Sequence, residues 1–211
     1  MSYQDYVIKN GKFIGKFNEM YKKYKDPWNL VKNNKNDFQL NYQIIFNLCN
    51  EARNRCSKKK ITVLEIGCGY PQILEKLKSN GFKVYGIDIS ETVINKSKKK
   101  FPRLRKNIFC SDLLNSKLIK KMNPDIYIMS DVSWYVLPKL KKFLKNIKTL
   151  KKNSFLIHSL TMYDKKKQKY GKKFFTNLKE IKKFFNLKFI FSGNIIIDEK
   201  KSNYSFFLAK I

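Results

Sequence analysis

Histidine, arginine and alanine are scarce in this sequence, and long apolar runs are missing. The single histidine, His158, and four cysteines without a C-x-x-C pair give too few suitably spaced ligands for a zinc site. We therefore expect no metal, and we expect reduced, buried thiols. No segment reaches the ~20 apolar residues of a membrane span, and the start MSYQDYVIKN lacks the apolar stretch of a secretory signal. These absences predict a cytoplasmic protein without a membrane span.

Acidic residues are few as well: 46 lysines and arginines stand against 16 aspartates and glutamates, so the formal net charge is +30. Such a charge is typical of proteins that bind nucleic acid. Only four of the basic residues are arginines, however, and arginine supplies the bidentate contacts that base and phosphate recognition favours. Lysine, asparagine and isoleucine have A/T-rich codons, so genome composition is one explanation of the charge and an anionic partner is the other. Small anionic substrates belong to the second explanation.

Short apolar segments alternate with helical patterns from residue 61 onward. Segments typical of strands buried on both faces of a parallel sheet lie at Ile61–Ile66, Lys83–Asp88, Asn107–Cys110, Asp125–Ser130 and Ser154–Ser159. Helical patterns lie between them, at Ile73–Ser79, Val93–Lys100, Leu118–Met122 and Leu140–Leu150, with Pro71, Ser90 or Glu91, and Pro138 at or near helix starts. This succession predicts an α/β fold with a Rossmann-like, doubly wound sheet.

The two ends of the chain depart from this pattern. A helix at Asn177–Phe185 precedes two apolar runs, Leu187–Ile197 and Tyr204–Lys210, which a polar loop separates. We expect these runs to form a C-terminal antiparallel hairpin that completes a seven-stranded sheet, with a bulge at Gly193. Residues 1–60 lack strand alternation, so we expect an N-terminal cap of helices and loops there.

The first predicted strand runs into Gly67-Cys68-Gly69, and Pro71 follows where many nucleotide-binding loops carry a third glycine. A strand, a glycine loop and a helix place backbone N–H groups and a helix N-terminus beside a bound ligand. The missing third glycine weakens the case for a nicotinamide or flavin cofactor. Proline is tolerated in a first helical turn, so Pro71 does not block the loop.

Three carboxylates lie at or near the ends of neighbouring predicted strands. Glu65 precedes the glycine loop, Asp88 stands nineteen positions after Gly69, and Asp112 follows the third strand. Open α/β sheets bind ligands at this edge. Asp88 is placed to accept hydrogen bonds from ribose hydroxyls, and Asp112 to accept one from an adenine amino group. Solvated acids at the strand ends of an ordinary nucleotide fold are the alternative.

The motifs E-I-G-C-G (65–69), G-I-D (86–88) and C-S-D-L (110–113), with the C-terminal hairpin, resemble class I S-adenosylmethionine-dependent methyltransferases. The resemblance implies S-adenosylmethionine as the cofactor and a methyltransferase domain over residues 61–211, which forms a single structural unit with the helical cap of residues 1–60. The residues that it places at the cofactor are Trp28, Glu65, Gly67, Cys68, Gly69, Asp88, Ile89, Asp112, Leu113 and Ser130.

The tripeptide Asp26-Pro27-Trp28 is similar to a D-P-W element of nodulation-type N-methyltransferases and methyltransferases of glycan-biosynthesis clusters. In that subgroup the tryptophan helps to close the cofactor pocket. Simple packing of the N-terminal cap is the alternative role for Trp28. Relatives carry, about a dozen positions later, a basic residue that binds the cofactor carboxylate. Here Gln39 or Asn41 stands in that neighbourhood, which is a departure from the pattern.

The segment that follows the fourth strand, residues 130–135, flanks the transferable methyl group in the family that the chain resembles. Asp131 is a candidate catalytic residue that orients or deprotonates the acceptor, with a helix cap as its alternative role. Trp134 and Tyr135 are candidate acceptor contacts. His158, at the end of the fifth strand, is the second candidate base, with a merely hydrogen-bonded neighbour as the alternative.

Residues 168–176, Q-K-Y-G-K-K-F-F-T, resemble a segment of the glycan-cluster relatives. Tyr163, Gln168 and Tyr170 are therefore expected on the acceptor side, and surface-loop packing is the alternative. The lysines of 165–167 and 172–173 are placed to meet phosphate groups or to form a solvated face.

The sequence thus predicts an enzyme that transfers a methyl group to oxygen or nitrogen of a small, anionic metabolite. A sugar nucleotide or another surface-glycan precursor is the specific hypothesis. Two alternatives stay open. One is an RNA methyltransferase with bases stacked on Tyr170, Phe174 and Phe175. The other is a cofactor-binding partner subunit without catalysis.

Overall fold

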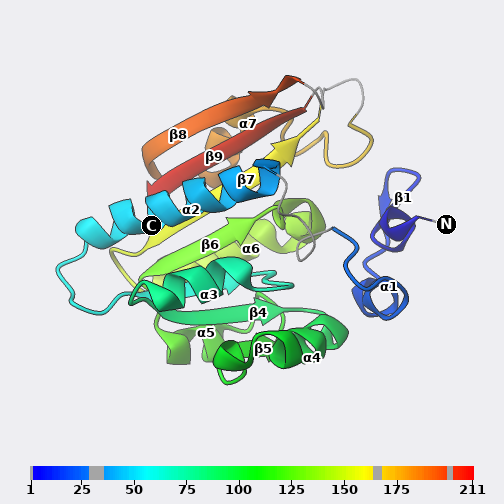
Figure 1. Ribbon diagram of the computed structural model, residues 1–211. Helices are drawn as coiled ribbons and strands as arrows, with labels where there is room; N and C mark the ends of the chain where they lie inside the picture. Colours follow the sequence, from blue (N-terminus) through cyan, green and yellow to red (C-terminus); the bar gives the residue numbers. More distant parts are fainter. Residues whose placement is uncertain (1, 29–35, 164–167, 199–201) are drawn as a thin grey trace.

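The computed structural model describes residues 2–28, 36–163, 168–198 and 202–211, and of residues 36–39 only the backbone. One seven-stranded sheet has the order β5-β4-β3-β6-β7-β9-β8 (Figure 1). The strands are β3 (Thr62–Ile66), β4 (Lys83–Asp88), β5 (Ile108–Cys110), β6 (Ile126–Ser130), β7 (Phe155–Met162), β8 (Lys188–Ile197) and β9 (Ser202–Lys210). Strands β3 to β7 are parallel, and β9 runs antiparallel to β7 and β8. The predicted α/β, doubly wound sheet with a C-terminal hairpin is confirmed.

Helices cover both faces of this sheet, because its central strands are apolar on both sides. One face carries α2 (Asn36–Asn54), α3 (Gln72–Ser79) and α4 (Glu91–Lys100) (Figure 1). The other carries α5 (Ser116–Met122), α6 (Ser133–Leu150) and α7 (Leu178–Phe185). Alternate residues of β3 enter the two cores, Val63 on the first face and Leu64 and Ile66 on the second.

The N-terminal region lies beside the carboxyl ends of the parallel strands (Figure 1). It contains a 3₁₀ turn η1 (Tyr3–Tyr6), strands β1 (Ile8–Lys9) and β2 (Lys12–Phe13), and α1 (Phe17–Lys23). The β1–β2 hairpin departs from the prediction of helices and loops. Its turn is Asn10-Gly11, with φ of 49° and 72°, and this dipeptide is a hairpin signal that the sequence did carry.

Helix starts agree with the prediction in two places and differ in a third. Ser90 caps α4 by accepting a hydrogen bond from the Val93 N–H, and Pro71 directly precedes α3. By contrast, α6 begins at Ser133, and Pro138 lies inside the helix. A continuous buried stripe outweighs the hydrogen bond that the proline removes; its members are Ser133, Trp134, Leu137, Leu140, Phe143, Leu144 and Ile147.

The predicted bulge at Gly193 is wrong, because the register of β8 against β9 shifts between Phe189 and Phe191 instead. Gly193 faces the ring of Phe206, and a Cβ there would lie 2.8 Å from its Cζ atom. The small residue therefore makes room for an aromatic side chain on the neighbouring strand.

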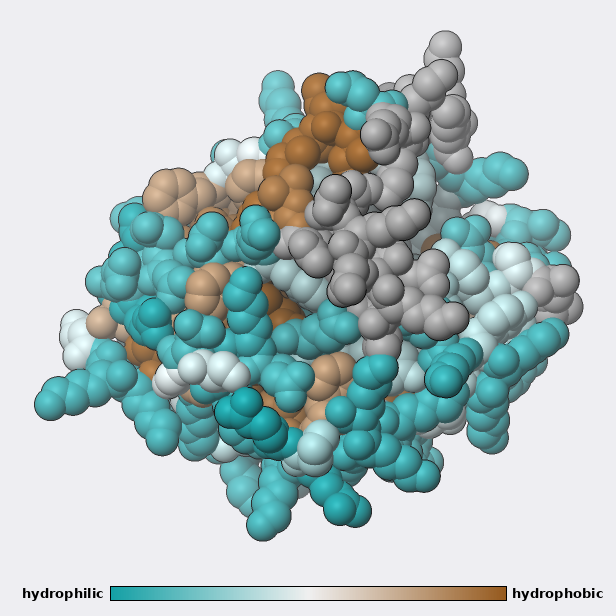
Figure 2. Space-filling model, in the orientation of Figure 1, coloured by the Kyte–Doolittle hydropathy of each residue, from teal (hydrophilic) through white to brown (hydrophobic). Residues whose placement is uncertain are grey.

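The surface is rich in lysine, and the cysteines are free thiols. Figure 2 shows hydrophilic side chains over most of the visible face, as the many lysines imply. Cys49 and Cys68 are buried free thiols, whereas Cys110 is an exposed one, unlike the prediction. Over the described ranges, every helix is too short or too polar to span a membrane. Within the same ranges, no three His, Cys, Asp or Glu side chains gather to hold a metal ion.

Asp125 joins three segments at the amino end of β6. Its Oδ2 accepts a hydrogen bond from the Thr62 N–H at 2.9 Å, and its Oδ1 lies 2.7 Å from Lys151 Nζ and 2.9 Å from Lys58 Nζ. Burial alone would raise the pKa of this carboxyl group. The Lys151 ammonium, the Thr62 N–H and the Lys58 ammonium nevertheless hold the pKa below its usual value.

We expect Asp125→Asn to lower the free energy of unfolding by about 2 kcal/mol near neutral pH, since a buried network loses its charged acceptor. Because the folded-state pKa is depressed, this contribution is present above the unfolded pKa of about 3.9 and fades as the pH falls through the folded value. Urea unfolding of both proteins from about pH 7 down to about pH 2 measures the difference. Asp198→Asn, at an exposed position, is the control. A constant difference at every pH would contradict the ion-pair explanation.

Candidate functional site

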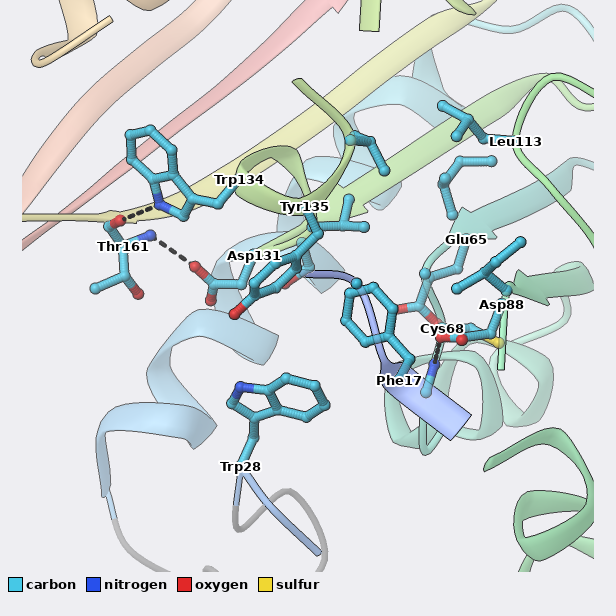
Figure 3. Close-up of a pocket in the computed structure, with 18 of the residues that line it drawn as sticks. Phe17, Trp28, Glu65, Cys68, Asp88, Leu113, Asp131, Trp134, Tyr135 and Thr161 are labelled. Carbon is cyan, nitrogen blue, oxygen red and sulfur yellow. Dashed lines mark hydrogen bonds between the residues drawn. The ribbon is translucent and has the colours of Figure 1, made fainter. Parts of the chain in front are cut away.

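A cavity of about 1020 Å³ opens at the carboxyl ends of β3, β4, β6 and β7. The glycine loop, the ends of β4 and β6 and the start of α6 form one part of its wall (Figure 3). The N-terminal region contributes a second, aromatic part, which consists of Tyr3, Phe13, Phe17, Tyr21 and Trp28. The cavity therefore lies where open α/β sheets bind ligands.

The glycine loop has a conformation that other residues adopt only under strain. Gly67 and Gly69 have φ of 69° and 44°. Gly67 also lies against Val132, since a Cβ at Gly67 would be 2.5 Å from the Cγ2 atom of that residue. The N–H groups of Gly67 and Cys68 donate to the Ile87 carbonyl at 2.8 and 3.0 Å, which fixes the loop on the end of β4. The backbone can thus approach a ligand closely.

Two buried carboxylates lie next to this loop. Asp88 accepts hydrogen bonds from the Gly69 N–H at 3.0 Å and the Ser90 N–H at 2.8 Å. Burial raises its pKa, although these N–H groups counteract the shift. Glu65 is buried with its Oε2 atom unpartnered, and burial together with the Asp88 charge raises its pKa well above the usual value. Glu65 therefore offers a free acceptor in the cavity wall.

The third strand-end acid is more exposed. Asp112 forms an ion pair with Lys139 and accepts a hydrogen bond from the Leu114 N–H at 2.8 Å. Burial would raise its pKa, but Lys139 and that N–H together lower it. Ile89 and Leu113 lie beside Asp112 in the wall and supply apolar surface for a flat ring.

Asp131 lies across the cavity from Glu65 and Asp88, as Figure 3 shows. Its backbone has a φ of 50°, which is unusual for a residue with a side chain. The carboxylate accepts hydrogen bonds from the Thr161 N–H at 2.6 Å and from the Tyr204 hydroxyl. Burial raises its pKa, and these two donors oppose the rise. Asp131 does not cap α6, whose N-cap Val132 has no side-chain hydrogen bond.

Aromatic rings line the space between these acids. Phe17 meets Tyr135 edge-on at 5.5 Å between ring centroids, and Trp28 lies 6.1 Å from Tyr135 and 5.5 Å from Tyr21 (Figure 3). Trp28 thus packs within the N-terminal region and also lines the cavity. Asn18 attaches this region to the start of α4, because its Oδ1 accepts hydrogen bonds from the Ser90 hydroxyl and the Thr92 N–H.

The structure brings most predicted acceptor residues to the cavity. Trp134, Tyr135 and Tyr163 line it, and the Trp134 indole donates to the Thr161 carbonyl at 3.0 Å. Gln168 does not line it; its amide is buried and donates to the carbonyls of Tyr170 and Phe175.

Tyr170 lies elsewhere as well. It lines a separate groove of about 690 Å³ together with Lys172 and Lys173. The lysines of 165–167 fall outside the described residues.

His158 is not at the cavity, which departs from the prediction. It is fully buried in β7, where its ring stacks on Phe207 and its Nε2 lies 2.8 Å from the Ser133 hydroxyl. Burial lowers its pKa to about 3. The ring points into the core between β7, β9 and α7, so the alternative of a hydrogen-bonded core residue describes it better.

Sequence reasoning missed several residues of the wall. Tyr204 reaches Asp131 because β9 pairs with β7 in a register that sets Tyr204 opposite Thr161. The hairpin was predictable, but its register was not. Phe17 and Tyr21 come from α1, where no motif marked them. Lys139 is one of many lysines, and only the turn of α6 brings it to Asp112.

We expect Gly67→Ala to destabilise the fold more than Gly81→Ala does. Both glycines have positive φ, 69° and 85°, so alanine costs about 1–2 kcal/mol at either position. An alanine methyl group at Gly81 would meet no described neighbour within 4 Å, whereas the contact with Val132 adds about 1–3 kcal/mol at Gly67. Urea unfolding of both variants measures the difference. Adding Val132→Ala should recover part of the loss, and equal losses at the two glycines would contradict the close contact.

Residues 64–157 match a family model described as a methyltransferase domain. The match covers less than half of the 211 residues and extends from β3 to β7. It includes the glycine loop, Asp88, Asp112 and Asp131. No curated protein sequence matches the chain.

Solved structures share the fold at low sequence identity. The N-methyltransferase NodS from Bradyrhizobium japonicum WM9, in complex with S-adenosyl-L-homocysteine, is 16% identical, with a TM-score of 0.64 over 95% of this chain and 99% of that one. Magnesium protoporphyrin IX methyltransferase (ChlM) from Synechocystis PCC 6803, with the same bound ligand, is 16% identical, with a TM-score of 0.64 over 92% and 95%. The bifunctional kinase-methyltransferase WbdD is 15% identical, with a TM-score of 0.61 over 83% of this chain and 40% of that one.

At such identities these neighbours show the fold, and the family match adds the class of activity. The ordered motifs at the carboxyl edge of the sheet agree with both. The acceptor of the methyl group is left open by all of these comparisons. The chain thus carries a methyltransferase domain, and its fold is that of solved S-adenosylmethionine-dependent methyltransferases.

Proposed function

We propose that the enzyme methylates an oxygen or nitrogen atom of a small, anionic metabolite, such as a sugar nucleotide or another surface-glycan precursor. The observation that carries this proposal is the half-buried carboxylate of Asp131, which faces the cofactor cavity among aromatic side chains. The D-P-W resemblance supports the glycan-related class, since Trp28 lines the same cavity.

The residues of the glycine loop and the strand ends fit the cofactor. The unpartnered Oε2 of Glu65 suits the methionine end, the oxygens of Asp88 suit ribose hydroxyls, and Asp112 beside Leu113 suits the adenine. When bound, S-adenosylmethionine supplies an electrophilic methyl group on a sulfonium centre. Glu65 and Asp88 also provide negative charge near that cation.

Asp131 is the proposed general base on the acceptor side. The hydrogen bonds from Thr161 and Tyr204 hold its carboxylate in one orientation, so that it can take a proton from an acceptor hydroxyl or ammonium group. Tyr135 and Trp28 exclude water from this space and help to align the acceptor. His158, which does not reach the cavity, has no part in the proposed mechanism.

The groove beside the cavity supports an anionic acceptor. It shares Pro138 with the cavity and is lined by Lys141, Lys172 and Lys173, with no acidic side chain among its described lining residues. A phosphate group attached to the acceptor would find positive charge there.

The RNA alternative finds less support. Phe175 is fully buried against Trp134, so it is not available to stack on a base. The N-terminal region also contributes five aromatic side chains to the wall, which suits a small acceptor better than a polymer. A cytoplasmic location stays part of the proposal, because all four cysteines are free thiols.

Calorimetric titration with S-adenosylhomocysteine tests the cofactor site. We expect saturable binding to the wild type and at least tenfold weaker binding to Asp88→Ala, since the ribose loses a charged acceptor. Asp198→Ala, far along the chain in an exposed position, is the control for charge and should bind like the wild type. Equal affinity of the Asp88 variant would contradict its assigned role.

Transfer of a labelled methyl group to a panel of nucleotide-linked amino and neutral sugars tests the acceptor side. We expect Asp131→Asn to lower kcat by about 10²- to 10⁴-fold, because the base is lost, while binding of S-adenosylhomocysteine stays within a few-fold of the wild type. Since the pKa of Asp131 is raised by burial, the wild-type rate should rise with pH through a value above about 3.9. No transfer to any member of the panel would contradict the proposed acceptor class, and full activity of Asp131→Asn would contradict the base.

A further inference from the structure

Two oxygen atoms in the wall of the cofactor cavity are buried and lack a hydrogen-bond donor. One is Oε2 of Glu65, at the end of β3, and the other is Oδ1 of Asn41, in α2. Their residues are only 6% and 3% exposed. A buried acceptor without a donor costs about 1–3 kcal/mol. Two such atoms in one cavity indicate a ligand that donates to both.

Asn41 is held in place by its other amide atom. Its Nδ2 donates to the hydroxyl of Ser130 at 3.2 Å, and that hydroxyl also accepts a hydrogen bond from Ser159 at 3.2 Å. Ser130 ends β6, the strand that pairs directly with β3, where Glu65 lies opposite Ile128. Asn41 and Glu65 therefore approach the same end of the cavity from a helix and from the adjacent strand.

The charges of the cavity indicate what this donor is. Among the described residues that line it, Glu65, Asp88, Asp112 and Asp131 are acidic and Lys139 alone is basic. Lys139 is already paired with Asp112. An ammonium group carries three N–H donors and a positive charge, so it satisfies both unpartnered oxygens and compensates the charge of Glu65.

We infer that Asn41 is a cofactor-positioning residue that accepts a hydrogen bond from the α-ammonium group of S-adenosylmethionine, together with Glu65. This inference rests on the proposed placement of the cofactor's methionine end at Glu65. Helix α2 then contacts the cofactor directly through Asn41. The N-terminal part of the chain therefore takes part in binding the amino-acid end of the cofactor.

Two ligands distinguish a contact between Asn41 and the ammonium group from an effect of Asn41 on the shape of the whole cavity. S-adenosylhomocysteine carries the ammonium group, whereas 5′-methylthioadenosine has the same adenosine and thioether without the amino-acid part. Calorimetric titration of both ligands into the wild type, Asn41→Leu and Asn41→Asp gives the comparison. Asn47→Leu, on an exposed position of the same helix, is the matched control.

We expect Asn41→Leu to bind S-adenosylhomocysteine about 10- to 100-fold more weakly, the usual effect of losing a hydrogen bond to a charged group, and to bind 5′-methylthioadenosine like the wild type. Asn41→Asp keeps an acceptor oxygen and should stay within a few-fold of the wild type for both ligands. Asn47→Leu should change neither affinity.

Three results would overturn the inference. Wild-type affinity of Asn41→Leu for S-adenosylhomocysteine would show that the contact is absent. Equal weakening for both ligands would show that Asn41 only shapes the cavity. A strong loss in Asn41→Asp with little loss in Asn41→Leu would show that the residue faces the cofactor carboxylate. If the folded wild type bound neither ligand, the cofactor site itself would be misplaced, which is a failure of the proposed function and is distinct from these three.

Discussion

The hydrogen bonds of the Asp88 carboxylate are the interaction on which the glycine-loop side of the cavity depends. The carboxylate accepts hydrogen bonds from the backbone of the loop after β3, at Gly69, and of the loop after β4, at Ser90. Ser90 in turn caps α4 and donates its hydroxyl to Asn18 of α1. One buried acid thus fixes two loops, a helix start and, through Ser90, the N-terminal region. Because an isolated buried carboxylate is costly, each of these donors also stabilises Asp88.

The side of the cavity that we assign to the acceptor depends on a different acid, which is held by donors in a similar way. Asp131 leaves β6 with positive φ, and donors from β7 and β9 hold its carboxylate. The C-terminal hairpin, which lies far from the glycine loop in sequence, therefore takes part in the site through Tyr204. A backbone strained at one residue and stabilised by its neighbours is common at functional sites.

Much of the fold followed from local patterns. The parallel strands are short and apolar throughout, the helix starts at Ser90 and Asn177 have capping side chains, and the glycine loop has a motif with a clear physical reason. These signals placed Glu65, Asp88, Asp112 and Asp131 at one edge of the sheet. The direction of the His158 side chain was not predictable in the same way. Side chains alternate along a strand, so a shift of one residue decides whether a side chain faces the cavity or the core.

The other features that the sequence did not predict depend on contacts between segments that are distant in the chain. Pro138 lies inside α6 because seven buried side chains outweigh one lost hydrogen bond, and that balance exists only in the folded protein. Gly193 was expected to mark a bulge, but it makes room for Phe206 on the neighbouring strand. The aromatic wall from α1 carries no motif, since its residues are defined only by the cavity that they surround.

The contrast between a lysine-rich exterior and an acidic cavity has a consequence for how the two substrates arrive. Screening limits the reach of each exposed charge to roughly 8 Å in physiological salt, but many surface lysines together create a field that draws anions toward the protein. Inside the cavity, short-range contacts with four carboxylates dominate and favour the cationic cofactor. For the anionic acceptor that we propose, the surface lysines would speed its diffusional capture, while the acidic cavity wall would select the cationic methyl donor, so neither substrate would weaken the binding of the other.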